Sequence, residues 1–361
     1  MSITSRSAVS SASSARPWLA LTQGDPAGIG PETIVKAFGL EPELMKGVLV
    51  VGQPEVLRRA ARAVQLAQGG WASGTATWPV VVLAEPADLE GCPPRCLPVL
   101  DPGTPMPDGL PQWGRVSAQA GRQAADAVLW AARAALRGQV AAVVTAPLHK
   151  EALHAAGVSY PGHTELLQAE AAAHAGVGLG GMPVRMMLAN QELRTVLVSI
   201  HVSLRQAIEA VTFDNVLDTL RITHDSLQRV LGRPPRIGVA GLNPHAGEGG
   251  LFGREELDII EPAVRAACAQ GMAVTGPWAP DTVYMRARRG EFDVVVAMYH
   301  DQGLIPVKYL GVEEGVNVTL GLPLVRTSPD HGTAFDIAGT GQADPSSLIE
   351  ALRMARRLAR I

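Results

Sequence analysis

Three histidines each follow a short apolar run, and this shared placement is the most suggestive chemical pattern in the chain. His201 comes after TVLVSI, His245 after RIGVA within GLNPHAGEGG, and His300 after DVVVAMY within YHDQG. Three neutral imidazoles suit Zn²⁺ or a similar divalent ion that keeps an open coordination position. The histidines are 44 and 55 residues apart, so they meet only if the fold or a second subunit brings them together. Taken singly, each can equally be an ordinary half-buried histidine.

A second polar cluster lies in VVTAPLHKEALHAAGVSYPGHTELL. An apolar run ends at Thr145, and a loop then leads to His163, Thr164 and Glu165 at the expected start of a helix. An imidazole and a hydroxyl beside free backbone N–H groups can hold an anionic substrate group. Alternatively, Thr164 only caps the helix, with Glu165 in its first turn.

Basic side chains reappear toward the C-terminal end of the chain. Lys308, Asn317 and Arg326 occur in DQGLIPVKYLG and GVNVTLGLPLVRTSPDHGTAFDIAGTG. Arg326 can bind an oxyanion through two N–H groups, and Lys308 can act as a point charge or as a base. The alternative is a set of solvated surface residues.

The segment LTQGDPAGIGPE predicts a strand, a tight turn and a helix start. Trp18 to Thr22 supply the strand, Gly24 to Gly30 the turn, and Pro31 with Glu32 the first helical residues. Such a junction directs backbone N–H groups toward an anion. Its glycines do not match GxGxxG, so the segment is a weak indication of dinucleotide binding, and an ordinary turn explains it equally well.

These clusters must be positioned by the elements between them. Short β-branched runs alternate with Ala-rich stretches of helix length, which predicts an α/β fold with a largely parallel sheet. Ligands of such sheets bind beyond the carboxyl ends of the strands, where the three histidines stand. We expect helices at Ser117–Leu136 and Leu204–Leu231, a loop at Gly91–Gly114, and strands at Gly47–Gly52, Val80–Leu83, Val140–Thr145, Thr195–Ile200, Arg236–Ala240 and Asp293–Met298.

Composition limits the class of protein. With 361 residues, 47% of them hydrophobic, the chain can bury a large core and is long enough for two lobes. A net charge of −3 argues against nucleic acid as a partner, and no apolar stretch approaches the roughly 20 residues that span a bilayer. Cys92 and Cys96 in CPPRC match no redox or zinc motif, so we expect free thiols and a cytoplasmic protein.

The N-terminal segment is rich in Ser, Ala and Arg and contains no acidic residue. We expect residues 1–17 to form a flexible tail. A transit peptide has the same composition and is the less favoured interpretation.

Beyond these single clusters, the chain resembles one enzyme family along nearly its whole length, from about Trp18 to the C-terminus. In order and spacing it is similar to the 4-hydroxythreonine-4-phosphate dehydrogenase family at GDPAGIGPE, TAPLHKEAL, PGHTELL, GLNPHAGEGG, GPWAPDT, YHDQGLIPVK, GVNVTLGLP and RTSPDHGTAFDIAGTG. The resemblance implies a two-lobed α/β/α fold like that of isocitrate and isopropylmalate dehydrogenases, with the active site in the cleft between the lobes. We expect residues 18–145 with 305–361 to form the cofactor lobe, and residues 146–304 to form the second.

The resemblance also implies a reaction. NAD or NADP would oxidise 4-phosphooxy-L-threonine to 2-amino-3-oxo-4-(phosphooxy)butanoate, which loses CO₂ to give 3-amino-2-oxopropyl phosphate in pyridoxal 5′-phosphate synthesis. A divalent metal (zinc, magnesium or cobalt) would favour loss of the hydroxyl proton and stabilise the charge formed on decarboxylation. The enzyme would be a homodimer with a shared metal site, and we expect His201 and His245 from one subunit and His300 from the other.

Carried over position by position, the family's roles fall on residues that the clusters already contain. The metal ligands would be His201, His245 and His300, and the substrate would contact His163, Thr164, Lys308, Asn317 and Arg326. The proton acceptor is open between Lys308, Asp281 and Asp301. The nicotinamide cofactor would bind at Asp330, His331, Gly332, Thr333, Asp336 and Gly339.

Three other functions fit the same residues less well. A sister dehydrogenase would act on threonate or erythronate 4-phosphate, and another would act on a cyclic dihydrodiol carboxylate. A binding protein without catalytic activity is the most distant alternative, because such a relative would more often have lost one of the three histidines.

Overall fold

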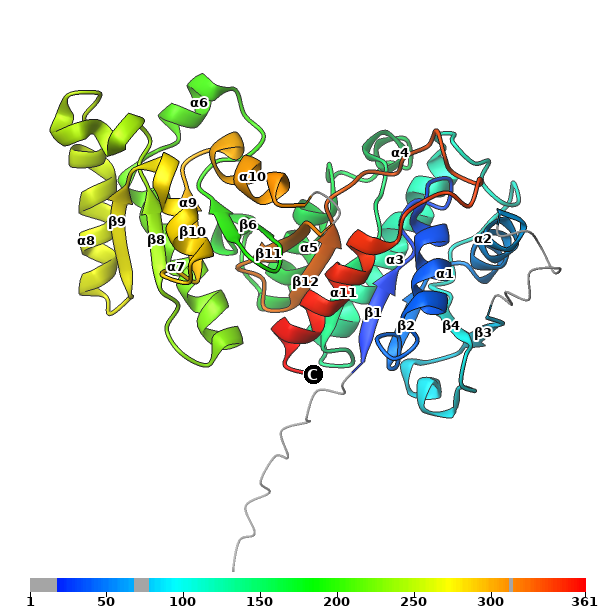
Figure 1. Ribbon diagram of the computed structural model, residues 1–361. Coiled ribbons are helices and arrows are strands. Elements are labelled where there is room, and N and C mark those ends of the chain that lie inside the picture. Colours follow the sequence, from blue (N-terminus) through cyan, green and yellow to red (C-terminus); the bar gives the residue numbers. More distant parts are fainter. Residues whose placement is uncertain (1–17, 68–77, 312–313) are drawn as a thin grey trace, which may run out of the picture.

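One continuous sheet of 12 strands runs through the described part of the computed structural model, residues 18–67, 78–311 and 314–361 (Figure 1). The strand order is β3-β4-β2-β1-β5-β12-β11-β6-β7-β10-β8-β9. Pairing is parallel except for β12–β11, β11–β6 and β6–β7 in the middle. The strands are β1 (Leu19–Thr22), β2 (Val48–Val51), β3 (Val80–Leu83), β4 (Leu97–Leu100), β5 (Ala142–Thr145), β6 (Arg185–Ala189), β7 (Arg194–Leu197), β8 (Ile237–Ala240), β9 (Val274–Trp278), β10 (Val294–Ala297), β11 (Val316–Leu320) and β12 (Val325–Pro329).

Helices cover both faces of this sheet and give a three-layer α/β/α arrangement with two lobes, joined by β11, β12 and α11 in the middle of Figure 1. The fold predicted from the alternating runs is thereby confirmed. The helices are α1 (Gly30–Leu40), α2 (Pro54–Ala67), α3 (Ala118–Leu136), α4 (Lys150–Ala155), α5 (His163–Ala175), α6 (Leu204–Glu209), α7 (Phe213–Leu231), α8 (Glu261–Ala269), α9 (Pro280–Arg288), α10 (His300–Tyr309) and α11 (Ser346–Ala359).

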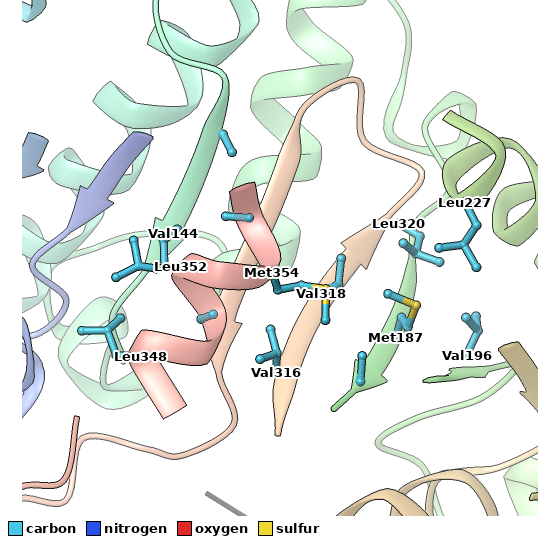
Figure 2. Close-up of a cluster of buried hydrophobic side chains, with 14 of the residues drawn as sticks. Val144, Met187, Val196, Leu227, Val316, Val318, Leu320, Leu348, Leu352 and Met354 are labelled. Carbon is cyan, nitrogen blue, oxygen red and sulfur yellow. The ribbon is translucent and has the colours of Figure 1, made fainter. Parts of the chain in front are cut away.

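One face carries a hydrophobic core that continues from one lobe into the other. Helices α1, α2 and α11 cover it in the first lobe, and α7 and α8 cover it in the second. Figure 2 shows the middle of this core, where Leu348 and Leu352 of α11 lie near Val144, and Val316 and Val318 of β11 continue toward the second lobe. Because this core is continuous, the two lobes share one hydrophobic layer on this side.

The opposite face is covered by two separate groups of helices. Leu153 of α4 and Leu167 of α5 pack with α3 over the first lobe, whereas Val283 of α9 and Leu304 of α10 pack over the second. These contacts differ from the expected lobe boundaries. Helices α4 and α5 belong by packing to the first lobe although they follow residue 146, and α10 spans the boundary expected at residue 305.

Local capping explains where several helices begin. The Ser117 hydroxyl accepts the Ala120 N–H at the start of α3, as the predicted Ser117–Leu136 helix requires. The predicted Leu204–Leu231 helix is wrong in one respect, because it is two helices. Helix α6 ends at Glu209, and Thr212 then caps α7 by accepting the Asn215 N–H.

Every expected strand is present, but the prediction was incomplete. The expected Gly91–Gly114 loop contains β4, a four-residue strand that includes Pro98, and the strands β6, β9, β11 and β12 were not predicted. The expected tail, residues 1–17, lies outside the described residues. No helix in the described ranges is long and apolar enough to cross a membrane.

Candidate active site

A cavity of about 430 Å³ opens between the two helix groups, over β6, β11 and β12. The strand alternation explains its polar floor. Asn317 and Thr319 of β11 face the cavity, whereas Val316 and Val318 face the core on the other side. All five predicted substrate-binding residues line the cavity, namely His163, Thr164, Lys308, Asn317 and Arg326.

Arg326 forms the basic floor of the cavity and is 4% exposed. Its Nη2 donates to Thr145 Oγ1 at 2.7 Å and its Nη1 to Thr319 Oγ1 at 3.2 Å. Among the described residues, no carboxylate lies within ion-pair distance of this guanidinium. Burial lowers its pKa to about 10, an effect that the more distant Glu165 opposes. A buried cation bonded only to neutral hydroxyls is costly, and a bound anion would compensate it.

His163 lies beside Arg326, at the first residue of α5. It is hydrogen-bonded to the backbone of Ala146, and its buried Nε2 has no hydrogen-bond partner within the described residues. Burial, and then the charge of Arg326, holds the pKa of His163 well below its usual range. Gly162 is the N-cap residue of α5, and no side chain caps this end, so Thr164 is not the helix cap. The unpaired backbone N–H groups of this helix start favour an anion.

We call Arg326, His163 and Thr164 the anion end of the cavity. Lys308 and Asn317 lie next to it on α10 and β11. Lys308 Nζ forms an ion pair with Asp330 Oδ2 at 2.7 Å. Unlike Arg326, Lys308 thus has a carboxylate partner.

His201 and His300 line the opposite side, and we call this pair the histidine end. Their ring centroids are 5.7 Å apart. His300 Nδ1 lies 2.7 Å from Asp301 Oδ1, which leaves its Nε2 for another partner. Burial and the nearby Lys150 lower the pKa of His201, so the imidazole is neutral at pH 7 and can ligate a cation.

His245 does not join this pair within one chain. It lies exposed in a turn after β8, with its ring centroid 6.3 Å from that of Phe252, and it does not line the cavity. In the described part of the chain, no three His, Cys, Asp or Glu side chains form a group that could hold a metal ion. The expected division, with His300 opposite His201 and His245, is therefore corrected: His201 and His300 are neighbours, and His245 stands apart.

The two aspartates suggested as proton acceptors have different positions. Asp301 is bound to His300, as described above. Asp281 is exposed in the first turn of α9 and does not line the cavity of its own chain. Lys308 is thus the one of the three candidate bases that lines the described cavity.

The predicted cofactor residues form a loop at the edge of the cavity. Asp330, His331 and Gly332 line it, whereas Thr333, Asp336 and Gly339 lie beyond. The loop is fastened to the turn after β1, because Ile29 N–H donates to the Thr333 carbonyl at 3.0 Å.

Glu32 is a second fastening point for the same loop. Its carboxylate accepts the N–H groups of Gly339 and of Gly341, the latter at 2.8 Å. The GDPAGIGPE segment therefore supports the loop that was predicted to bind the cofactor. Its role as an anion-binding turn stays a prediction.

Sequence reasoning missed several residues that line the cavity. Two of them are charged: Lys150 lowers the pKa of His201, and Glu165 raises it. Three more, Thr145, Thr319 and Ser328, line the floor of the cavity. Lys150 adjoins the polar TAPLH loop after β5, a position that could have indicated it. Thr319 and Ser328 carried no such signal, because β11 and β12 were not recognised as strands.

The fold and the cavity define the class of protein: an α/β protein with a small-molecule site built for an anion at one end and with two imidazoles at the other. A family model described as "Pyridoxal phosphate biosynthetic protein PdxA" matches residues 44–355. The chain therefore belongs to the PdxA family.

Individual relatives agree with this assignment. The chain is 51% identical to the 4-hydroxythreonine-4-phosphate dehydrogenase of Beijerinckia indica subsp. indica, with 94% of each chain covered. It is 44% identical to the D-threonate 4-phosphate dehydrogenase of Pectobacterium atrosepticum, with 94% of this chain and 99% of that one covered. The crystal structure of the Klebsiella pneumoniae 4-hydroxythreonine-4-phosphate dehydrogenase superposes with a TM-score of 0.83 at 42% identity, covering 95% of this chain and 100% of that one.

Proposed function

We propose that the chain is an NAD(P)-dependent and metal-dependent dehydrogenase of 4-hydroxythreonine 4-phosphate. It rests on one observation: within the described residues, a buried arginine that has no carboxylate partner shares a cavity with two histidines whose rings are 5.7 Å apart. Its relatives bear the name of this activity. The product, 2-amino-3-oxo-4-(phosphooxy)butanoate, is a β-keto acid and would lose CO₂ to give 3-amino-2-oxopropyl phosphate.

The anion end would hold the phosphate. Arg326 would offer its N–H groups to two oxygens, and His163 Nε2 and Thr164 would contact the same group. Lys308 and Asn317 would orient the rest of the substrate. Anchoring by a group remote from the reacting carbon places that carbon reproducibly against the cofactor, which makes the reaction effectively unimolecular.

The histidine end fits a divalent cation. His201 and His300 would supply two ligands, and His245 of a second subunit would supply the third. Zinc, magnesium or cobalt bound there would act as a Lewis acid toward the substrate oxygen. The candidate proton acceptors are Lys308, Asp301 and Asp281. Of these, Lys308 lines the cavity, and it would first have to lose the proton of its ammonium group.

The nicotinamide cofactor would bind along the loop from Asp330 to Gly339, next to the cavity. Asp330, His331 and Gly332 would be nearest to the substrate. The cofactor, when bound there, would supply the hydride acceptor for oxidation of the secondary alcohol.

A homodimer completes the proposed site. Large apolar side chains are exposed in the segments that carry His201, His245 and His300. Leu204 of α6 is 60% exposed, Leu251 after the His245 turn is 73% exposed, and Ile305 and Tyr309 of α10 are 61% and 91% exposed. A second copy of the chain would cover these side chains. In solution, we expect a mass about twice the 37.9 kDa of one chain.

A second candidate function is oxidation of D-threonate 4-phosphate. Relatives with that name are as similar to this chain as several with the first name, at 44% identity. The two substrates share the phosphate and the secondary alcohol, so the anion end serves both. They differ in the amino group of the first.

A cytoplasmic location also stays a prediction. It rests on the thiols of Cys92, Cys96 and Cys268, which are free in the structure.

Cofactor reduction, followed by absorbance, tests the proposal. The protein is stripped of metal with a chelator and assayed with 4-hydroxythreonine 4-phosphate or D-threonate 4-phosphate, with NAD or NADP, and with or without added Zn²⁺, Mg²⁺ or Co²⁺. Metal-dependent turnover of the amino acid substrate is the expected result. Turnover of D-threonate 4-phosphate alone would transfer the activity to the second candidate, and no turnover with either substrate would refute the dehydrogenase.

A further inference from the structure

Hydrogen bonds from side chains outside the cavity join the three strand ends that precede the histidines. Strands β7, β10 and β8 are neighbours and run parallel, so their carboxyl ends lie at one edge of the sheet. Ser199, two residues before His201, donates its hydroxyl to the Met298 carbonyl at 2.9 Å. This bond fixes the end of β7 to the end of β10.

Gln302 makes the corresponding link between β10 and β8. Its Oε1 accepts the Met298 N–H at 2.7 Å, and its Nε2 donates to the Gly241 carbonyl at 2.7 Å. Gln302 lies two residues after His300, and Gly241 is the first residue after β8, on the path to His245. The amide thus accepts from one strand end and donates to the other.

The segment beyond Gly241 is held in an unusual conformation. His245, Ala246 and Glu248 have φ values of 53°, 52° and 43°, and Gly247 and Gly249 also have positive φ. L-residues rarely adopt this left-handed conformation, and it persists only where the surroundings enforce it.

Glu256 is the buried group that enforces the turn. It is 2% exposed, and its Oε1 accepts the N–H groups of Leu242 and Asn243, each at 2.7 Å. Its Oε2 accepts the Asn243 side-chain amide at 2.9 Å. The residues from Gly241 to Asn243, which lead to His245, are thus hydrogen-bonded by both Gln302 and Glu256.

We propose that Gln302 is a positioning residue for the metal site. It does not line the cavity, so its effect passes through the histidines that it holds. The inference rests on the proposed function in one respect, because it takes the three histidines to be metal ligands. Since His245 would serve the partner's site and His300 its own, Gln302 holds ligands of both metal sites of the dimer in a fixed relation.

The test compares Gln302→Met with Gln270→Met in the intact protein. Methionine keeps the length of the side chain and removes both hydrogen bonds, and Gln270 is an exposed glutamine at the end of α8. Zn²⁺ affinity is measured by competition with a chelator, and inorganic phosphate affinity reports on the anion end. We expect Zn²⁺ affinity to fall by about 10- to 100-fold in Gln302→Met, as for other residues that orient metal ligands, with phosphate affinity and the control variant unchanged.

Ser199→Ala provides a second, milder variant that removes a single hydroxyl. We expect it to weaken Zn²⁺ binding by less than Gln302→Met does. Wild-type Zn²⁺ affinity in both folded variants would overturn the positioning role, and so would a parallel loss of Zn²⁺ and phosphate affinity. If the wild-type protein itself bound Zn²⁺ no better than His300→Ala does, the metal site would fail, and this inference with it.

Discussion

The two ends of the cavity are built in different ways. One chain assembles the anion end from a buried arginine and a helix start, and the sheet fixes both. The histidine end has two neighbouring imidazoles, whereas His245 lies exposed in a turn and does not line this cavity. Under the proposed function, substrate anchoring would therefore be a property of the single chain, whereas metal binding would be a property of the dimer.

The largest effect is expected at the histidine end. His201→Ala, His245→Ala and His300→Ala should each lower Zn²⁺ affinity by roughly 1000-fold, because an open catalytic site has only three protein ligands to lose. Chelator competition measures this loss. The exposed His174→Ala serves as the control and should bind as wild type does. A His245→Ala variant with wild-type affinity would remove that residue from the site.

At the anion end, Arg326→Ala should raise KM for the substrate by about 100-fold, since charged hydrogen bonds contribute about 1.5–3 kcal/mol each. Of the substrate-contacting residues it should have the largest effect on binding. Steady-state kinetics measure the change, and Arg326→Lys, which keeps the charge but not the two-pronged geometry, should lie between. Zn²⁺ affinity should not change. An unaltered KM would refute the assignment of this arginine.

A smaller effect is expected for Asp301, which bonds to His300 Nδ1. Asp301→Asn should lower Zn²⁺ affinity by about 10-fold, as for other carboxylates that orient ligating histidines. The affinity for inorganic phosphate should stay the same. If Asp301 is instead the base, kcat will collapse while Zn²⁺ affinity is retained, and kinetics beside chelator competition separate the two cases.

The smallest effect is expected at His163, which should take up a proton when an anion binds. Burial and Arg326 hold its pKa well below the ordinary value, so it is neutral in the free protein at pH 7. An anion bound beside it opposes both effects and raises this pKa, so phosphate binding should take up as much as about one proton per site. Calorimetry in buffers of different ionisation enthalpy measures the uptake, and His163→Asn should abolish it. Uptake that persists in His163→Asn would assign the proton to another group.

The lowered pKa of His163 also makes the folding stability depend on pH. Because the pKa of His163 is lowered in the folded state, its neutral form contributes stability that is fully present above the unfolded value of about 6.5. This contribution is lost as the pH falls below that value. The direction is the same as for other buried neutral histidines.

Much of the site could be predicted from the sequence because its residues follow strands. His201, His300 and His163 come after apolar runs that the structure confirms as β7, β10 and β5, and parallel strands collect such residues at one edge. Thr319 and Ser328 could not be predicted, since β11 and β12 lie next to Gly- and Pro-rich segments that indicate loops. The arrangement of the three histidines could not be predicted either. No sequence pattern indicates that His245 stays outside the cavity, because its place depends on a turn of five residues with positive φ and on the buried Glu256.

The most direct test of the central claim is complementation between two inactive variants. His245→Ala and His300→Ala chains, each carrying a different tag, are produced together, and the mixed dimers are assayed for metal-dependent cofactor reduction. If His245 completes the partner's site, half of the sites in each mixed dimer are intact. The isolated mixed dimers should then have about half of wild-type activity, and the unfractionated, randomly paired mixture about a quarter. If each chain binds the metal by itself, every site lacks one ligand, and the mixture will stay as inactive as the separate variants.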